Sequence, residues 1–329
     1  MLKLKYLFEN YDLARECLAN YEYEEEKLDE MLSWFRISSN AIYPFNSKNG
    51  MCFLRLSPVE EKEFENVLSE IQLINWLIEK GFPVMKPVPM KNGELAKIID
   101  TEWGTYNVSC FSKVTGEDLE SSDGSIEVVR GYGQILGKLH ELMKEYPYAK
   151  QHLTHKDMLD EIGDRIKKYK APEMVIKEYQ IVCDELKNTP ISEETYGVIH
   201  YDFEADNVFY NPEDKIFSVI DFDDAICCWY ALDIVRALDS LDDVVPEQCD
   251  YDAEAAFIEG YESVLKLTME QKQSFSIMRR LVRLQECATI LHVLSEPVTE
   301  KPDWMEGLIN KLNYKLKCLE NAICKEGEI

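Results

Sequence analysis

The chain has 329 residues, of which 46% are hydrophobic and 11% aromatic, enough to fill the cores of two cooperating lobes and too apolar for a disordered protein. Its 62 acidic residues outnumber 36 lysines and arginines, and the formal net charge of -26 argues against a nucleic-acid partner, which usually meets a basic face. The acidity could attract a cationic substrate, although a solvated, repulsive surface that aids solubility is the simpler interpretation.

The cysteines and the apolar runs indicate the compartment. The chain holds 10 cysteines without a Cys-x-x-Cys pair, and most lie in apolar surroundings such as MCFL (51–54) and VSCF (108–111). The start MLKLKYLFENYD does not resemble a signal peptide, and no apolar run is long enough to cross a membrane. We therefore expect a cytoplasmic protein with reduced thiols and no membrane partner.

The first third of the chain favours short strands with one long helix between them. The helix is expected from about Pro58 to Lys80, where Gly81 and Pro83 form a stop signal. Its apolar residues recur at helical spacing, so that one face can pack on a sheet. The expected strands are separated by Gly, Asn and Pro turns and lie in FRISSNAIYPF (35–45), MCFLRLS (51–57), ELAKIID (94–100) and TYNVSCFSKV (105–114).

After residue 115 the hydrophobic period becomes helical. Long helices are predicted in EVVRGYGQILGKLHELMKEY (127–146) and from about residue 251 to the C-terminus. Within 196–221, strand-like runs interrupt this pattern. The sequence thus predicts an α+β fold with a small β-rich lobe over residues 1–114 and a larger, mainly helical lobe over residues 115–329.

Two features resemble functional motifs, but neither has the residue spacing that its motif requires. GYGQILGKLH (131–140) lacks the Gly-x4-Gly-Lys-Ser/Thr spacing of a phosphate loop and is better explained as an amphipathic helix. The remaining candidates are histidines, which show no metal-site spacing, and HLTHK (152–156) is most simply a polar loop or a helix start. These histidines are His140, His152, His155 and His292.

The stretch VIHYDFEADNVFY (198–210) places polar residues between two apolar flanks, and VIDFDD (219–224) follows it. The runs NVFY and FSVI, joined by the turn NPEDK, predict a hairpin that brings Asn207 near Asp221. Phosphoryl transfer needs a carboxylate that orients the attacking hydroxyl and oxygen ligands that hold magnesium. Asp202 suits the first role, and Asn207 with Asp221 suits the second. Ordinary turn chemistry explains NPED well but predicts neither the ordered spacing nor an aspartate that ends an apolar strand.

These residues resemble the His-x-Asp-x4-Asn and Ile-Asp-Phe-x-Asp pattern of the aminoglycoside phosphotransferase and choline kinase-like family. That resemblance implies a protein-kinase-like two-lobe fold and an ATP- and magnesium-dependent kinase for small-molecule hydroxyl groups. It implies Asp202 as the catalytic base, His200 as a buttress of the catalytic loop, and Asn207 and Asp221 as magnesium ligands. A simple buried hydrogen-bonding role for His200 is equally consistent.

The resemblance extends to the nucleotide site. Arg55 stands in the place of the phosphate-contacting lysine, and Glu70 in that of its helix partner. VSCFSKVTGEDL (108–119) is similar to the hinge that receives adenine through its backbone, with Ser112 and Val114 as the expected contacts. A glycine-rich phosphate loop is not visible, and SSNAIY (38–43) would have to cover the phosphates through its backbone and Asn40.

Two departures from the family pattern affect the expected chemistry. The planar guanidinium of Arg55 grips phosphate differently from a lysine, so ATP and other nucleoside triphosphates both stay open as donors. Glu204 and Asp206 replace the histidine and glycine found inside many catalytic loops, and the pattern assigns no role to either.

Further residues near the motif have simpler explanations than catalysis. Asp233 is expected to cap a helix, while Asp223 and Asp224 are expected to serve the local turn. Trp229 and Tyr230 suit the core better than a substrate pocket. The acidic stretch DSLDDVVPEQCDYDAE (239–254) could receive amines of a substrate or could be a solvated connection between helices.

The sequence therefore predicts a cytoplasmic phosphotransferase that acts on a hydroxyl group of an aminoglycoside, an amino alcohol or a hydroxy amino acid. A catalytically weak, pseudokinase-like nucleotide-binding protein is the main alternative, because of Arg55 and the altered loop. A metal-dependent hydrolase that uses His200, Asp202 and Asp221 is a further one. A protein kinase is disfavoured, since no Asp-Phe-Gly to Ala-Pro-Glu segment follows Asp221.

Overall fold

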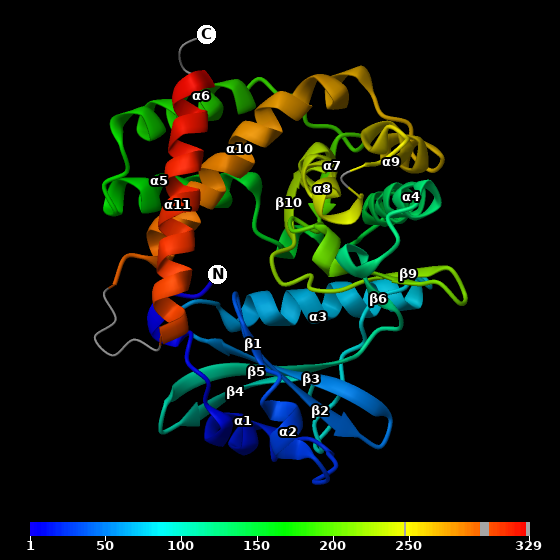
Figure 1. Cartoon of the computed structure of the whole chain (residues 1–329), viewed down its shortest axis with the longest axis vertical. Coiled ribbons are helices and arrows are strands. Elements are labelled where there is room, and N and C mark those ends of the chain that lie inside the picture. Colours follow the sequence, from blue (N-terminus) through cyan, green and yellow to red (C-terminus); the bar gives the residue numbers. More distant parts are fainter. Residues whose placement is uncertain (247, 297–302, 327–329) are drawn as a thin grey trace.

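The computed structural model describes residues 1–246, 248–296 and 303–326, which form two lobes (Figure 1). The smaller lobe contains η1 (Leu4–Tyr6), α1 (Tyr11–Leu18), α2 (Leu28–Leu32), β1 (Arg36–Ile37), β2 (Ala41–Ser47), β3 (Gly50–Pro58), α3 (Phe64–Glu79), β4 (Ala96–Thr101) and β5 (Gly104–Ser112). The larger lobe contains β6 (Glu117–Asp118), η2 (Leu119–Ser121), α4 (Ile126–Met143), η3 (Ala149–Gln151), α5 (His155–Lys168), α6 (Glu173–Leu186), β7 (Tyr196–Ile199), η4 (Ala205–Asn207), β8 (Val208–Asn211), β9 (Ile216–Val219), β10 (Ile226–Trp229), α7 (Tyr230–Asp239), α8 (Leu241–Val244), α9 (Ala253–Glu262), α10 (Met269–Val293) and α11 (Asp303–Glu326).

The small lobe is built on one antiparallel sheet with the order β1-β2-β3-β5-β4. Apolar side chains at alternate positions of β2, β3 and β5 point to the same face, as the two-residue period of a strand requires. Helices α1 and α2 cover this face, and α3 lies between the sheet and the large lobe (Figure 1). The β-rich lobe with one long helix is confirmed, and two short helices that the sequence did not predict precede the sheet.

The long helix begins later than expected. Pro58 is the last residue of β3, where it pairs with Tyr106, and α3 starts only at Phe64. The loop between them is held by tertiary contacts, because Val59 N donates to Thr105 O and Asn107 Nδ2 donates to the Lys62 carbonyl. These contacts override the helical pattern of residues 58–63. The predicted end is correct, since Gly81 follows the helix with φ +76°.

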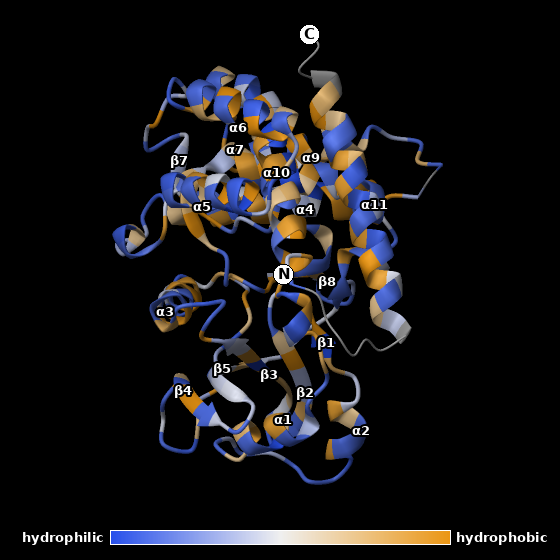
Figure 2. Cartoon of the chain, turned by 90° about the vertical axis from the view of Figure 1, so that its left-hand side faces the viewer, coloured by the Kyte–Doolittle hydropathy of each residue, from blue (hydrophilic) through white to orange (hydrophobic). Residues whose placement is uncertain are grey.

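The long helices of the large lobe, such as α4 and α10, bury one stripe each and leave polar faces outside, as the alternating colours of Figure 2 show. Helix α7 is buried on all sides except at its last residue. Helix α4, the stretch that resembled a phosphate loop, packs against α9. A Cβ atom on Gly133 would lie 2.0 Å from the backbone oxygen of Phe257, so glycine is required for this close approach. Gly133 and Gly137 therefore serve packing against α9, whereas Gly131 leaves room for the ring of Phe217 on β9.

The predicted hairpin is confirmed: β8 and β9 pair antiparallel from Val208 opposite Val219 to Asn211 opposite Ile216. A strand that the sequence did not predict, β10, pairs antiparallel with β7 and leads directly into α7. Trp229 and Tyr230 are buried at this junction, as expected for core residues. Among the described residues, no helix is long and apolar enough to cross a membrane.

Candidate functional site

The loop between β7 and β8, which carries the residues predicted to be catalytic and is called the catalytic loop below, is held by a buried carboxylate of α7. Asp233 accepts hydrogen bonds from the backbone amides of His200 (2.8 Å) and Tyr201 (2.7 Å) and lies 3.1 Å from His140 Nε2. Tyr201 has φ +74°, a strained conformation for a non-glycine residue, and these bonds help to hold it. The expectation that Asp233 caps its helix is wrong, because α7 has no side-chain cap and the carboxylate points to the loop instead.

His200 ties the catalytic loop to the strand that ends at Asp221. Its Nε2 donates to the carbonyl of Ile220 at 2.8 Å, and its ring packs on Phe222 with centroids 4.5 Å apart. Burial lowers the pKa of His200, so the ring stays neutral at physiological pH. The side chain is fully buried, which suits a supporting role for the loop.

Asp202 lies at the open side of the loop, with 44% of its side chain exposed. Asn207 Nδ2 donates to its carbonyl (2.9 Å) and to its Oδ2 (3.2 Å), and Arg236 Nη1 lies 3.6 Å from Oδ1. Although 44% of the side chain is exposed, the carboxyl group is partly withdrawn from solvent, which raises the pKa of Asp202 to about 7, and the cation of Arg236 opposes this effect. A carboxyl group with such a pKa can take up a proton near neutral pH.

Asn207 and Asp221 meet at the same end of the β8–β9 pair. The backbone amide of Ile220 donates to the carbonyl of Asn207 at 3.0 Å, which fixes the two residues in register. Asn207 Oδ1 accepts no hydrogen bond from the described residues, and Asp221 is 36% exposed with φ +63°. Burial, reinforced by the nearby Asp223, raises the pKa of Asp221 even though Arg55 opposes it.

These two side chains could hold a hard divalent cation, because amide and carboxylate oxygens are the donors that Mg²⁺ prefers. Across the described residues, no group of three or more His, Cys, Asp and Glu side chains has the arrangement of a metal site. The donor set therefore fits a metal that is shared between two protein ligands and the phosphates of a nucleotide.

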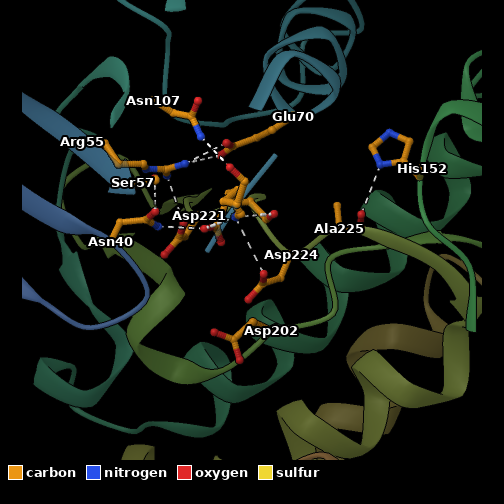
Figure 3. A network of polar contacts seen from close by, with 12 residues as sticks. Asn40, Arg55, Ser57, Glu70, Asn107, His152, Asp202, Asp221, Asp224 and Ala225 are labelled. Carbon is orange, nitrogen blue, oxygen red and sulfur yellow. Dashed lines mark hydrogen bonds and ion pairs between the residues drawn. The ribbon is translucent and has the colours of Figure 1, made fainter. Parts of the chain in front are cut away.

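Arg55 of β3 joins the small lobe to this site (Figure 3). Its Nη1 donates to both carboxylate oxygens of Glu70 at 2.7 Å, and its Nη2 donates to Asp221 Oδ1 at 3.0 Å. Both Arg55 and Glu70 are buried, and the guanidinium lies 4.6 Å from the centre of the Phe111 ring. The structure thus brings together the two residues that the sequence paired, and adds a direct contact to Asp221.

A second group of small-lobe side chains converges on Asp223. Asn40 Nδ2 donates to Asp223 Oδ2 at 2.7 Å, while the oxygen of Asn40 accepts from the Ser57 hydroxyl. Lys62 donates to the carboxylate and to the carbonyl of the same aspartate. Burial alone would raise the pKa of Asp223, but Lys62 and then Arg55 outweigh it and lower the pKa. The expectation that Asp223 serves only its local turn is wrong, since it joins the lobes.

The segment between the lobes begins where β5 ends. The amide of Ser112 donates to the Lys86 carbonyl at 2.9 Å, and that of Lys113 to the Met51 carbonyl at 3.0 Å. The amide of Val114 makes no hydrogen bond to any described residue, so it is free to meet a ligand. Of the two predicted adenine contacts, the amide of Ser112 is thus already paired and that of Val114 is not.

Glu204 and Asp206, which the sequence left unassigned, each have a partner of opposite charge. Glu204 accepts from Arg236 Nη1 at 2.8 Å, and Arg236 Nη2 donates to Gln285 Oε1 at 2.9 Å. Asp206 lies 3.1 Å from Arg36 Nη2 on β1. Glu204 therefore anchors the catalytic loop to the large lobe, and Asp206 connects the loop to the small lobe.

A cavity of about 570 Å³ opens beside the catalytic loop, between the two lobes. One wall is the small-lobe loop 59–63, and another is formed by α5 and α10. Tyr201, Asp223 and Asp224 line it from the site described above. The lining combines acidic groups such as Glu63 and Asp157 with apolar side chains. The described part of the acidic stretch 239–254 does not reach the cavity, which favours its interpretation as a connection between helices.

Lys62 and Arg236 are site residues that were not predicted from the sequence. Arg236 had a weak signal, since it and Asp233 are two charged residues in the apolar helix ALDIVRAL, where an unpaired charge would be costly. Lys62 had none, because it lies in a charged run, EEKE, that is typical of a solvated surface. His152 and His155 have structural roles. His152 contacts the Ala225 carbonyl at 3.1 Å, and His155 is the first residue of α5, directly after the N-cap residue Thr154, which forms a capping box.

Comparison with known proteins gives consistent results. The sequence model of the phosphotransferase enzyme family matches residues 38–267. Amicoumacin kinase of Bacillus subtilis (strain 168) is 25% identical over 264 residues, which cover 78% of this chain and 75% of that protein.

Two solved structures share the fold. An amicoumacin kinase in complex with AMP-PNP, Ca²⁺ and amicoumacin superimposes with a TM-score of 0.75 at 17% identity, covering 95% of this chain and 94% of the other. A microcompartment-associated aminopropanol kinase gives a TM-score of 0.68 at 17% identity, with 97% and 99% covered. The expected protein-kinase-like two-lobe architecture is thereby confirmed.

Proposed function

This chain belongs to the phosphotransferase enzyme family, and from this premise we propose that it transfers the terminal phosphoryl group of ATP to a hydroxyl group of a small molecule, with Mg²⁺ as its metal. One observation carries the proposal: Asn207 donates to the carboxylate of Asp202 and is bonded through its carbonyl to Ile220, the residue before Asp221. The neighbouring residues Tyr201, Asp223 and Asp224 line a cavity of about 570 Å³. The kinases for amicoumacin and aminopropanol that resemble this chain support an acceptor of the same general class.

We assign the nucleotide to the cleft between residues 1–114 and 115–329. The unpaired amide of Val114 suits a hydrogen bond to adenine. The carbonyl of Ser112, the last residue of β5, would make a second hydrogen bond to the same base. Arg55, oriented by Glu70, suits the phosphates. The turn between β1 and β2 would cover them through its backbone, since the side chain of Asn40 is bonded to Asp223 and Ser57. Magnesium, once bound by Asn207 and Asp221, would neutralise the charge that develops on the transferred group.

Asp202 would act on the acceptor. Its exposed carboxylate can accept a hydrogen bond from the acceptor hydroxyl, align the oxygen for attack and take up the proton as the new bond forms. Asn207, bonded to both the carbonyl and the carboxylate of Asp202, keeps this group in place. His200 and Asp233 would contribute by fixing the loop backbone, without touching the acceptor.

The acceptor would occupy the cavity between loop 59–63, α5 and α10. Acidic groups in its lining favour an acceptor that also carries a protonated amine, and apolar side chains such as Met158 and Ile162 favour one with a hydrocarbon portion. An amino alcohol satisfies both conditions. The strongly polar aminoglycosides would interact with the acidic side chains of the cavity but would leave its apolar side chains without a hydrocarbon partner.

A turnover assay with ATP and magnesium tests this function across amino alcohols, aminoglycosides and hydroxy amino acids. We expect acceptor-dependent formation of ADP, highest with an amino alcohol. The variant Asp202→Ala should lose turnover by about 10³-fold or more while retaining nucleotide binding. Normal phosphorylation by that variant would refute the assignment.

A catalytically weak, pseudokinase-like nucleotide-binding protein is the second candidate. It is favoured by the contact between Arg55 Nη2 and Asp221 Oδ1, because the metal would need the same carboxylate. In that case, the nucleotide would raise the thermal stability, yet no member of the acceptor panel would stimulate ADP formation.

A further inference from the structure

Two aspartates stand two positions apart after β9, and their surroundings differ. Asp221 is 36% exposed and shares Oδ1 with Arg55, while its Oδ2 accepts no hydrogen bond from the described chain. Asp223 is 4% exposed. Both are hard oxygen donors of the same charge, so sequence alone does not decide which of them a divalent cation would choose.

Asp223 is engaged by donors from the small lobe. Lys62 Nζ donates to the backbone carbonyl of Asp223 at 2.8 Å and also to its carboxylate. Asn40 Nδ2 donates to Oδ2 of the same carboxylate at 2.7 Å. Figure 3 shows Asn40, Arg55 and Asp221 close together, with Asp202 on the far side of Asp221 from Arg55.

Lys62 is held in this position rather than being a mobile surface lysine. Its side chain is 16% exposed, and its backbone carbonyl accepts from the buried Asn107 Nδ2 at 2.7 Å. Its Nζ also lies 3.8 Å from Asp224 Oδ1. The loop is thus fixed to β5, and the ammonium group reaches across the cleft to the acids that follow Asp221.

We propose that Lys62 is a positioning residue that keeps Asp223 from binding the metal, so that Asp221 stays the carboxylate ligand. This rests on the proposed function, in which Asp221 binds a divalent cation. A buried carboxylate without its cation is strongly attractive to a divalent ion, and Asp223 lies only two residues from the ligand. An ammonium group that satisfies both the carboxylate and the carbonyl of Asp223 removes this competition.

The test measures metal binding without nucleotide, with Mn²⁺ as a paramagnetic probe in place of Mg²⁺. Lys62→Met should bind Mn²⁺ about tenfold more tightly than the unchanged protein, because Asp223 is released as an additional ligand. Its turnover with ATP and magnesium should fall, since the metal is drawn away from the Asp221 geometry. Lys62→Arg, which keeps the positive charge, should restore most of the original affinity.

Three variants make the result specific. Asp223→Asn alone should leave Mn²⁺ affinity within about twofold, whereas Lys62→Met combined with Asp223→Asn should lose the gain of the single variant. Lys80→Met is the matched control, because Lys80 lies 3.3 Å from Glu145 near the other end of α3, far from the aspartates in sequence. It should change neither Mn²⁺ affinity nor turnover.

The inference is overturned if Lys62→Met binds Mn²⁺ as the unchanged protein does, or if Asp223→Asn alone weakens binding as strongly as Asp221→Asn. Should Lys62→Met fail to fold, the comparison of the two aspartate variants still decides which carboxylate is the ligand. Failure of the proposed function would give a different result, namely no acceptor-dependent turnover, whatever the Mn²⁺ measurements show.

Discussion

At the scale of single residues, we expect Asp202 and Arg236 to govern the acid-base behaviour of the site. Burial raises the pKa of Asp202 to about 7, and the proposed base works only when ionised. We expect kcat/KM to rise with pH through about 7 and to level off above it. Arg236→Met removes the cation that lowers this pKa, so the acidic limb should move to higher pH.

The measurement is a pH profile of kcat/KM for both proteins. Arg279→Met is the control, since Arg279 pairs with Asp239 outside the site. Its profile should match that of the unchanged enzyme. An acidic limb that stays in place in Arg236→Met would mean that another group controls the ionisation.

Asp233 supports a second prediction, on stability and rate together. Asp233→Asn keeps the shape of the side chain but loses the charge and one of two acceptor oxygens, so that His200 N or Tyr201 N is left without a full partner. We expect the free energy of unfolding to fall by about 2–3 kcal/mol, the size for buried hydrogen bonds to a charged group. kcat should fall, because the loop that carries Asp202 loosens.

Urea unfolding and turnover together check this prediction, with Asp239→Asn at the exposed end of the same helix as the control. That variant should change stability by less than about 0.5 kcal/mol. Equal effects of the two substitutions would contradict a special role for Asp233.

The residues proposed to contact substrate and metal were easier to predict than those that hold them in place. Asp202, Asn207 and Asp221 stand out because their spacing is unusual for ordinary turns, whereas Asp233 acts through a contact 33 residues away in sequence that no local pattern encodes. Lys62 was missed for the same reason, since a lysine in a charged run gives no sign that its ammonium group is buried against Asp223. The roles proposed for Ser112, Val114 and Asn40 stay predictions until a ligand is bound.

At the scale of elements, the hydrophobic periodicity of the sequence predicted which helices and strands exist better than it predicted where they begin and end. The strands of the small lobe, helix α4 and the β8–β9 hairpin all appear where the pattern indicated. The first residues expected in α3 became a loop, because Asn107 and Asp223 bind Lys62 and hold it out of the helix. Strand β10 was missed because its ICCW sequence is fully buried and shows no alternation.

Gly116, in the segment between β5 and β6, supports a third prediction. It has φ +87°, and a Cβ there would lie 2.3 Å from the Tyr210 carbonyl oxygen. Gly116→Ala should therefore destabilise the protein by more than the roughly 1–2 kcal/mol that the left-handed backbone alone costs. It should also weaken nucleotide binding, because the displaced segment carries the amide of Val114.

Gly93→Ala is the matched control. Gly93 has φ +91° but no atom within 4 Å of the added Cβ, so it isolates the backbone cost from the steric clash. Thermal unfolding and nucleotide titration of both variants give the comparison. If Gly116→Ala were no more harmful than Gly93→Ala, the close packing against Tyr210 would not be needed to position the segment.

At the scale of the whole molecule, the two lobes are joined by polar contacts on several sides of the cleft. Arg36 reaches Asp206 at 3.1 Å, and Lys62 reaches Asp223. On the side of α10, His292 Nε2 lies 3.0 Å from Glu61 Oε2 in the small-lobe loop. The overall charge of the chain is -26, so the arginine and lysine pairs also offset some of the repulsion among its acidic groups.

The excess of negative charge leads to the last prediction. Raising the ionic strength from about 0.01 M to about 0.15 M shortens the screening length from about 30 Å to about 8 Å. Repulsion among surface carboxylates should weaken, while buried pairs such as Arg55 with Glu70 are screened much less. We therefore expect the melting temperature to rise over this range, and KM for a cationic acceptor to rise as its attraction to the protein weakens.

Replacing Glu22, Glu24 and Glu26 by glutamine provides the comparison. All three are exposed, and the substitution moves the net charge from -26 to -23 without removing a side-chain partner among the described residues. The variant should melt higher at low salt and show a smaller rise with added NaCl. A melting temperature that falls with salt in the unchanged protein would instead mean that surface ion pairs outweigh the repulsion, and the acidity would then have to be explained by a binding role.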